Sequence, residues 1–179
     1  LGRVNTGSVA QRLADTPGVA RTILDAARAA RGMPGADPRA MSHSWLFTGP
    51  PGSGRSLAAL DFAAALMCTD PEEPGCGRCE ACQAVLDAKQ HTDLVLVDPQ
   101  EVIIPVDTVR EVIGRAASLP TVAPWRVVIF NNADRLNNNG ANALLKTVEE
   151  PPARTVIIMC APSDAPEDFS QTLRSRCRH

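Results

Sequence analysis

Residues 45–56, which read WLFTGPPGSGRS, decide the fold of this chain. They begin with a short apolar run, typical of a buried strand, and pass through a turn rich in glycine and proline into an apolar helical segment, 56–67. The turn has the spacing G-x-x-x-x-G-K-[ST], in which backbone amides and the positive end of the helix bind phosphate oxygens. We therefore expect a phosphate-binding loop (P-loop) formed by Gly49, Pro50, Pro51, Gly52, Ser53, Gly54, Arg55 and Ser56.

One position of this loop departs from the pattern, because Arg55 stands where the lysine belongs. A lysine ammonium is compact and reaches the β- and γ-phosphates, whereas a guanidinium is planar and bulky. Ser56 is in the position of the hydroxyl that would hold Mg²⁺. Binding of ATP with Mg²⁺ and no binding of nucleotide both remain open, and we expect no independent ATPase activity.

Apolar strands and helices alternate along the rest of the chain. Besides 45–48, strands are expected at 94–97, 127–130 and 155–159, and helical segments at 9–31, 106–117 and around 141–148. Such alternation indicates a three-layer α/β domain with a parallel sheet that is covered by helices on both faces.

The end of the third strand lacks the acidic residues of a working ATPase. An Asp that holds Mg²⁺ and a Glu that orients water are expected there, but Asn131 and Asn132 follow the strand. Asp134 comes later, and we interpret it as a cap of the following turn. Both departures, at Arg55 and at the two asparagines, indicate a degenerate ATP site.

Four cysteines lie in an insert over residues 68–82 with the spacing C-x7-C-x2-C-x2-C. Four thiolates suit a tetrahedral Zn²⁺ ion, and Gly77 permits the tight turn between the second and third of them. With no open coordination position, the zinc would be structural. An iron–sulfur cluster and free thiols remain alternatives to zinc at Cys68, Cys76, Cys79 and Cys82.

Composition narrows the class of protein. The chain has 179 residues, 44% of them hydrophobic and 21% charged, which fits one globular domain. Its formal net charge of −2 gives no general attraction to nucleic acid or membrane. No run approaches the roughly 20 apolar residues that span a bilayer. We therefore expect a cytoplasmic protein without a membrane partner. Arg110 and Arg115, on one expected helix, are the best candidates for contact with DNA, although a solvated helix face is the favoured interpretation of these two residues.

Several motifs occur together in a fixed order: the P-loop, the four-cysteine insert, the segment 141–151 (ANALLKTVEEP) and the ending Ser175-Arg176-Cys177. This combination resembles the AAA+ domain of bacterial DNA polymerase III clamp loaders, over roughly residues 9–179. The motor subunits (γ/τ) of that family have an intact P-loop lysine and an acidic pair, while its δ′ subunit has degenerate versions of both. The chain therefore looks like the δ′ type.

The resemblance implies a role for Arg176. In this family the Arg of Ser-Arg-Cys acts in trans, as an arginine finger on the ATP of a neighbouring subunit. The family's N-terminal nucleotide-recognition segment falls on Ala14-Asp15-Thr16, which departs from its usual sequence. Residues 1–179 would form the AAA+ core, and the lid and collar domains of the family are not part of this sequence.

The function implied is that of a δ′-type scaffold in DNA replication. Its partners would be the γ/τ and δ subunits, the sliding clamp and primed DNA within the complex. Two alternatives remain at this point: a divergent γ/τ-type motor that hydrolyses ATP despite Arg55, and a zinc-bearing P-loop module of another remodelling protein.

Overall fold

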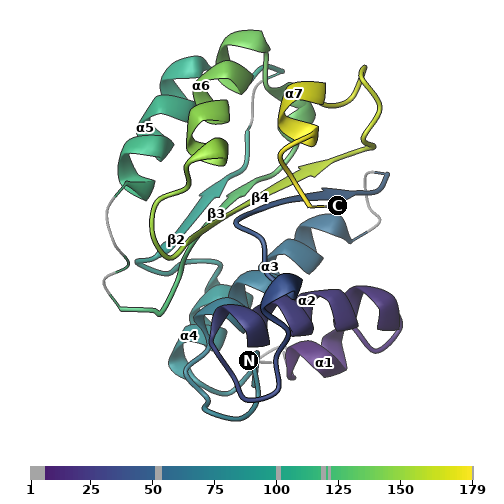
Figure 1. Cartoon of the computed structure of the whole chain (residues 1–179), viewed down its shortest axis with the longest axis vertical. Helices are drawn as coiled ribbons and strands as arrows, with labels where there is room; N and C mark the ends of the chain where they lie inside the picture. Colours follow the sequence, from purple (N-terminus) through teal and green to yellow (C-terminus); the bar gives the residue numbers. More distant parts are fainter. Residues whose placement is uncertain (1–6, 51–53, 100–101, 118–119, 121, 179) are drawn as a thin grey trace.

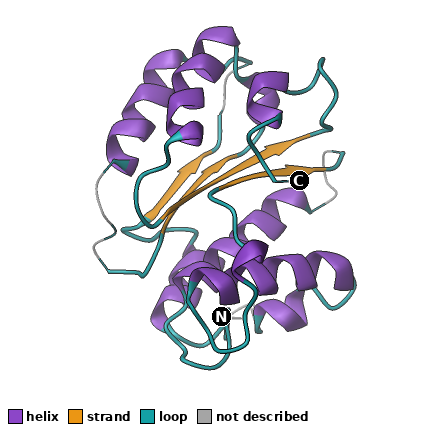
Figure 2. Ribbon diagram, in the orientation of Figure 1, coloured by secondary structure: helices purple, strands orange, loops and turns teal. Residues whose placement is uncertain are grey.

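A four-stranded parallel sheet with helices on both faces forms the domain (Figures 1 and 2). The structure is a computed structural model, and it describes residues 7–50, 54–99, 102–117, 120 and 122–178. The strands are β1 (Ser44–Thr48), β2 (Leu94–Val97), β3 (Arg126–Phe130) and β4 (Thr155–Ala161), in the order β1-β4-β3-β2. The expected fold class, a three-layer α/β domain, is confirmed.

Seven α-helices surround the sheet within the described part of the chain. They are α1 (Val9–Arg12), α2 (Pro17–Ala30), α3 (Arg55–Met67), α4 (Glu80–Gln83), α5 (Val106–Ala116), α6 (Asn138–Glu149) and α7 (Gln171–Arg174). Short 3₁₀ turns cover Pro38–Ala40 and Ala133–Arg135, and a π-helical turn covers Ala84–Ala88. The first four helices lie on one side of the sheet and the last three on the other (Figure 1).

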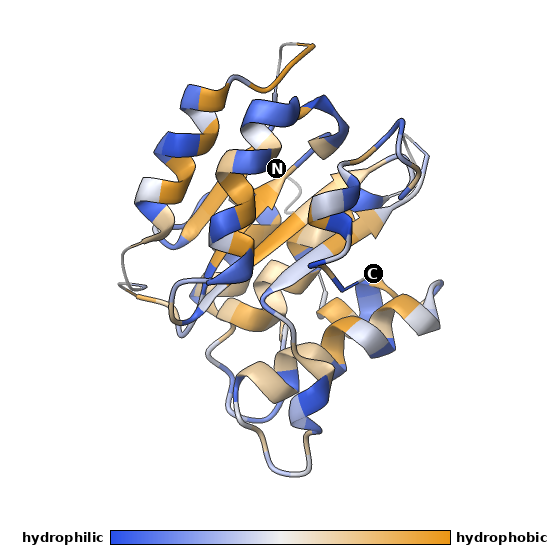
Figure 3. Cartoon of the chain, turned by 45° about the horizontal axis from the view of Figure 1, so that its top comes forward, coloured by the Kyte–Doolittle hydropathy of each residue, from blue (hydrophilic) through white to orange (hydrophobic). Residues whose placement is uncertain are grey.

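The core has two halves because side chains alternate across each strand. Trp45, Ile129 and Ile158 face the layer of α1 to α4, and Leu46, Phe130 and Ile157 face the layer of α5 to α7. The strands are accordingly coloured as hydrophobic along most of their length in Figure 3. Helix α3 is buried from Ala59 to Met67, because it packs against the sheet and is covered by α1, α2 and α4.

The helical region expected over 9–31 is divided into two helices. A capping box formed by Ser8 and Gln11 begins α1, and the chain leaves helical geometry near Leu13. Pro17 then occupies the first turn of α2, where its missing amide hydrogen costs nothing. The division matters for the site below, because residues between the two helices lie beside the P-loop.

The end of the described chain adds to the sheet. Arg178 forms a parallel bridge with Trp45 of β1, through hydrogen bonds from Arg178 N to Ser44 O at 2.9 Å and from Leu46 N to Arg178 O at 2.8 Å. The residues just before Arg178 are thereby placed next to the sheet edge. Among the described helices, none combines the length and apolar composition needed to cross a lipid bilayer.

Candidate functional site

The P-loop connects β1 to α3 at the carboxyl edge of the parallel sheet. Pro51, Gly52 and Ser53 of the predicted loop lie outside the described residues. The amide of Gly49 donates to the carbonyl of Ala161 in β4 at 3.2 Å, which fixes the start of the loop. Gly54 precedes α3 with a φ of +89°, a conformation that residues with a Cβ rarely adopt. Both described ends of the loop thus lie where ligands bind in folds of this kind.

Arg55 does not point freely into this site. Its Nη1 donates to the carbonyl of Gly49, and its Nη2 donates to Oδ1 of Asn132 at 3.1 Å. Asn132 is the second residue after β3 and has a φ of +53°. The side chain that replaces the expected lysine therefore connects the first residue of the P-loop to the end of β3.

The two asparagines differ in their surroundings. Asn131 pairs through its amide with Val97 O at 2.9 Å, and its Oδ1 is buried without a hydrogen-bond partner among the described residues. Asn132 faces the guanidinium of Arg55. Neutral amide oxygens bind Mg²⁺ less strongly than a carboxylate, and the charge of Arg55 repels a divalent cation. This set of groups does not fit a Mg²⁺ site.

Asp134 does not supply the missing acid. It is exposed and lies inside the 3₁₀ turn Ala133–Arg135 rather than capping it, so its interpretation as a cap is wrong. The helix that follows is capped instead by Asn137, whose Oδ1 accepts a hydrogen bond from Gly140 N at 2.9 Å.

A cavity of about 880 Å³ lies beside the P-loop and is lined by Gly49, Gly54 and Arg55. The segment between α1 and α2 forms another part of its wall, through Asp15 and Thr16. The structure therefore brings together the P-loop and the segment in which the resemblance places nucleotide recognition.

The same cavity contains an ion pair that the sequence analysis missed. Nε of Arg12 lies 2.6 Å from Oδ1 of Asp61, whose side chain is only 3% exposed. Burial raises the pKa of Asp61, and the neighbouring Arg12 opposes this shift. The signal in the sequence was an isolated acid within the apolar segment 56–67.

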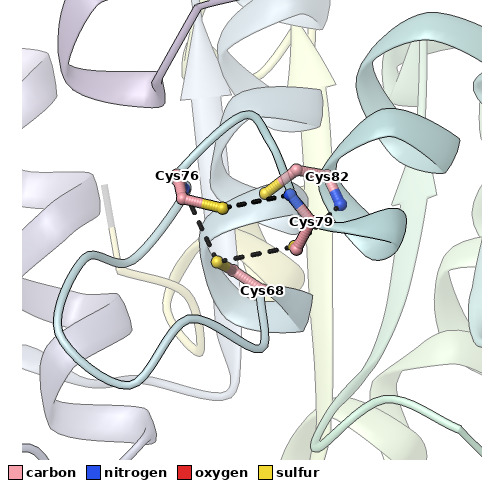
Figure 4. A group of neighbouring side chains, drawn as sticks. All are labelled: Cys68, Cys76, Cys79 and Cys82. Atoms are coloured by element: carbon pink, nitrogen blue, oxygen red, sulfur yellow. Dashed lines mark hydrogen bonds between the residues drawn. The ribbon is translucent and has the colours of Figure 1, made fainter.

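The four predicted cysteines converge in space (Figure 4). Their sulfur atoms all lie within 4.8 Å of one another. Cys68 ends α3, Cys79 and Cys82 belong to the start of α4, and Cys76 lies in the turn between them. Gly77 has a φ of +75°, and a Cβ there would clash with the carbonyl oxygen of Gly7. The expected tight turn at this glycine is confirmed.

The geometry and hydrogen bonds of the cluster suit a metal bound by thiolates. A tetrahedral ion with sulfurs at about 2.3 Å requires sulfurs roughly 3.8 Å apart. The sulfurs of Cys68 and Cys79 are 3.8 Å apart. Backbone amides donate to three of the sulfurs: those of Asp70 and Cys76 to Cys68, of Arg78 and Cys79 to Cys76, and of Cys82 to Cys79.

The donors to Cys68 and Cys76 favour the charged thiolate form, but burial outweighs them at Cys76 and raises its pKa. The Cys82 thiol, together with the amides of Cys76 and Asp70, lowers the pKa of Cys68 to about 4. The hydrogen bond with Cys68 and burial raise the pKa of Cys82. A cation among the four sulfurs would compensate several thiolates at once, so the donor set fits a structural metal ion.

The Ser175-Arg176-Cys177 segment follows α7 and is held on both sides. Cys177 is half-buried against the α5–α7 half of the core, and burial raises its pKa to about 12. Arg178 pairs with β1, and its guanidinium lies 5.7 Å from the centre of the Trp45 ring. Arg176 lies between the end of α7 and these two anchors. It is exposed, and its Nη2 lies 3.3 Å from Oε1 of Glu149.

A basic groove lies between α5 and α6, and the residues that line it are distant in sequence from the P-loop. It has a volume of about 690 Å³ and is lined by Arg110, Lys146 and residues that include Asn139 and Asn142. Arg115, the other predicted candidate for DNA contact, lines a different hollow that also contains Asp98 and Glu111. The structure therefore separates Arg110 from Arg115 and places Lys146 beside Arg110.

Comparison with known proteins gives matches over most of the chain. The family described as "DNA polymerase III, delta subunit" matches residues 36–179. Over 139 residues the chain is 38% identical to the DNA polymerase III subunit delta′ of Pseudomonas aeruginosa, covering 76% of this chain and 42% of that protein. Over 145 residues it is 36% identical to the DNA polymerase III subunit gamma/tau of Mycobacterium bovis, covering 80% of this chain and 25% of that protein.

A solved structure supports the fold. A DNA polymerase III gamma subunit-related protein from Thermotoga maritima superimposes with a TM-score of 0.54 at 21% identity, covering 75% of this chain and 39% of that one. The chain spans about two fifths of the length of the delta′ relative and a quarter of the gamma/tau relative.

Proposed function

Because the chain belongs to the family of DNA polymerase III clamp-loader subunits, we propose that it acts as a δ′-type subunit in DNA replication. In this role it is a scaffold with a degenerate ATP site, and it supplies Arg176 to the ATP of a neighbouring motor subunit. The observation that carries the proposal is the contrast between Arg55, which is tied to Asn132, and Arg176, which is exposed on an anchored segment.

The chain's own nucleotide site supports a role without independent ATP hydrolysis. Arg55 bonds to the P-loop backbone and to Asn132, so it is not available as a lysine would be for the β- and γ-phosphates. Asn131 and Asn132 provide neither a charged ligand for Mg²⁺ nor a group that orients water. Ser56 keeps its hydroxyl, but no acidic partner at the end of β3 complements it.

Arg176 has the properties that an arginine finger needs. It projects from a segment fixed by Cys177 and Arg178, so its backbone position is defined. A guanidinium placed against a γ-phosphate stabilises the charge that develops during transfer and contributes about 10³–10⁵-fold in rate. The neighbouring motor subunit, of the γ/τ type, would provide that phosphate.

The remaining features fit roles within the same assembly. We assign a structural Zn²⁺ ion to Cys68, Cys76, Cys79 and Cys82, which would fix the loop between α3 and α4. The groove with Arg110 and Lys146 is suited to the phosphates of primed DNA, since each side chain offers a positive charge beside amide groups. The δ subunit and the sliding clamp complete the proposed set of partners.

The direct test replaces Arg176 in the full-length protein, assembled with its partner subunits. Arg176→Ala should lower DNA-stimulated hydrolysis at the adjacent motor site by about 10³-fold or more in a single-turnover measurement. Arg174→Ala is the control, because Arg174 is the last residue of α7, two positions before Arg176, and pairs with Asp164 of its own chain. Unchanged hydrolysis and clamp loading with Arg176→Ala would contradict the proposal.

A second candidate function is that of a divergent γ/τ-type motor. It is favoured by the 36% identity to a gamma/tau subunit, close to that with delta′. It requires steady ATP turnover by the purified full-length protein, increased by Arg55→Lys. Absence of turnover in both proteins would remove it. The family match already removes the alternative of an unrelated remodelling protein.

A further inference from the structure

Glu149 faces Arg176, and the function proposed above leaves it without a role. Oε1 of Glu149 lies 3.3 Å from Nη2 of Arg176, and the two side chains are 41% and 55% exposed. Glu149 is the last residue of α6, while Arg176 follows α7. The two helices are in contact, so the fold brings these residues together from distant parts of the chain.

The stability of the domain does not explain a carboxylate at this place. The carboxyl end of a helix carries partial negative charge, so acidic residues are unfavourable there and basic ones are favourable. Glu149 is followed by a second acid, Glu150, at the same helix end. An ion pair as exposed as that of Glu149 with Arg176 contributes little to folding. A local cost without a clear stabilising gain indicates that the carboxylate serves another purpose.

The geometry of the guanidinium indicates what that purpose is. An arginine side chain is long and flexible, but its five N–H donors form a rigid planar fork. Glu149 contacts one terminal nitrogen, which leaves Nε and Nη1 of Arg176 for other acceptors. A carboxylate at the end of a packed helix therefore restricts where the guanidinium lies without using all its donors.

We propose that Glu149 is a positioning residue for Arg176: it holds the guanidinium in the orientation in which its free edge meets the phosphate of the neighbouring subunit. The inference rests on the proposed role of Arg176 in trans. It adds that the carboxyl end of α6 and the segment after α7 act together as one functional unit.

Glu150 offers a matched control for the test. It is the adjacent exposed acid, and it forms no ion pair with another described residue. In the full-length protein assembled with its partners, Glu149→Gln should lower kcat for DNA-stimulated ATP hydrolysis about three- to tenfold, with KM for ATP unchanged. Glu150→Gln should change kcat by less than about twofold. Thermal unfolding of both variants should match that of the original protein, which separates positioning from stability.

A double-mutant cycle distinguishes the two levels of the proposal. In an Arg176→Ala background, Glu149→Gln should have no further effect on hydrolysis, because the residue through which it acts is gone. If Arg176→Ala itself has no effect, the proposed function fails. If Arg176→Ala lowers hydrolysis but Glu149→Gln behaves like Glu150→Gln, only the positioning role is overturned. An increase in kcat with Glu149→Gln also overturns it, because the carboxylate would then be restraining Arg176.

Discussion

The guanidinium of Arg55 donates a hydrogen bond to the side-chain oxygen of Asn132 across 77 positions of sequence. The same guanidinium donates to the carbonyl of Gly49. These contacts join the two places where the chain departs from an active P-loop ATPase. Arg55 and Asn132 are therefore partners in one arrangement, in which a connection within the protein occupies part of the space between the P-loop and the end of β3.

The first prediction concerns the stability that this connection provides. Arg55→Ala removes the bonds to Gly49 and Asn132 and should lower the free energy of unfolding by about 1–2 kcal/mol. Equilibrium unfolding in urea measures the change. Arg21→Ala, on the exposed side of α2, is the control and should change it by less than about 0.5 kcal/mol. Equal effects of the two substitutions would mean that the Arg55 contacts carry no net stability.

The second prediction concerns the metal. The protein should contain about one equivalent of zinc by elemental analysis, and a strong chelator should lower its unfolding temperature. Cys76→Ser should abolish stoichiometric zinc, because it removes one of the four thiolates. Cys177→Ala should retain the zinc, since Cys177 packs in the opposite half of the core. Iron in place of zinc would identify a different cluster, and loss of zinc from both variants would contradict the assignment of ligands.

The third prediction concerns pH and the buried pair in the cavity. Burial raises the pKa of Asp61, so the folded chain binds this proton at a higher pH than the unfolded chain does. This titration therefore stabilises the fold fully when the pH is below 3.8, the ordinary pKa of the carboxyl group. The stabilisation is lost as the pH rises through the pKa of Asp61 in the folded chain.

Asp61→Asn removes this titration while keeping the shape of the side chain. The stability of the original protein relative to the variant should then increase as the pH falls from about 7 to 4. Urea unfolding of both proteins at several pH values measures the difference. A difference that stays constant across this pH range would show that the pKa of Asp61 is not raised by folding.

The fourth prediction concerns the groove between α5 and α6. If Arg110 and Lys146 contact DNA phosphates, Arg110→Ala and Lys146→Ala in the assembled complex should each weaken binding of primed DNA. Each should also reduce the slope of log K against log salt concentration by about 1, the release of one counterion. Arg21→Ala lies in the opposite helical layer and should leave the slope unchanged. A slope that none of the three alters would place the DNA contact elsewhere.

Local patterns were sufficient to predict the sheet and the cluster of four cysteines. The strands expected at 94–97 and 127–130 match β2 and β3 within one residue, because buried runs of Val and Ile have few other ways to fold. The cysteine cluster is also encoded locally, since its ligands lie within one short insert and Gly77 allows the turn.

Local sequence patterns could not predict the contacts that define the candidate site. The bonds from Arg55 to Asn132, from Arg176 to Glu149 and from Arg178 to β1 join segments that only the tertiary fold brings together. The four-residue helix α7 was not predicted, because so short a segment has no measurable period. Sequence alone therefore identified the residue types at the site but not which of them are partners.

The bridge between Arg178 and Trp45 has a mechanical consequence. Trp45 lies on β1, the strand from which the chain's own P-loop departs at Gly49. Arg176 is thus connected to the strand that carries the P-loop: it lies two residues before the bridge at Arg178, and the P-loop begins four residues after Trp45. A displacement of β1 along the sheet would therefore move the P-loop and Arg176 together.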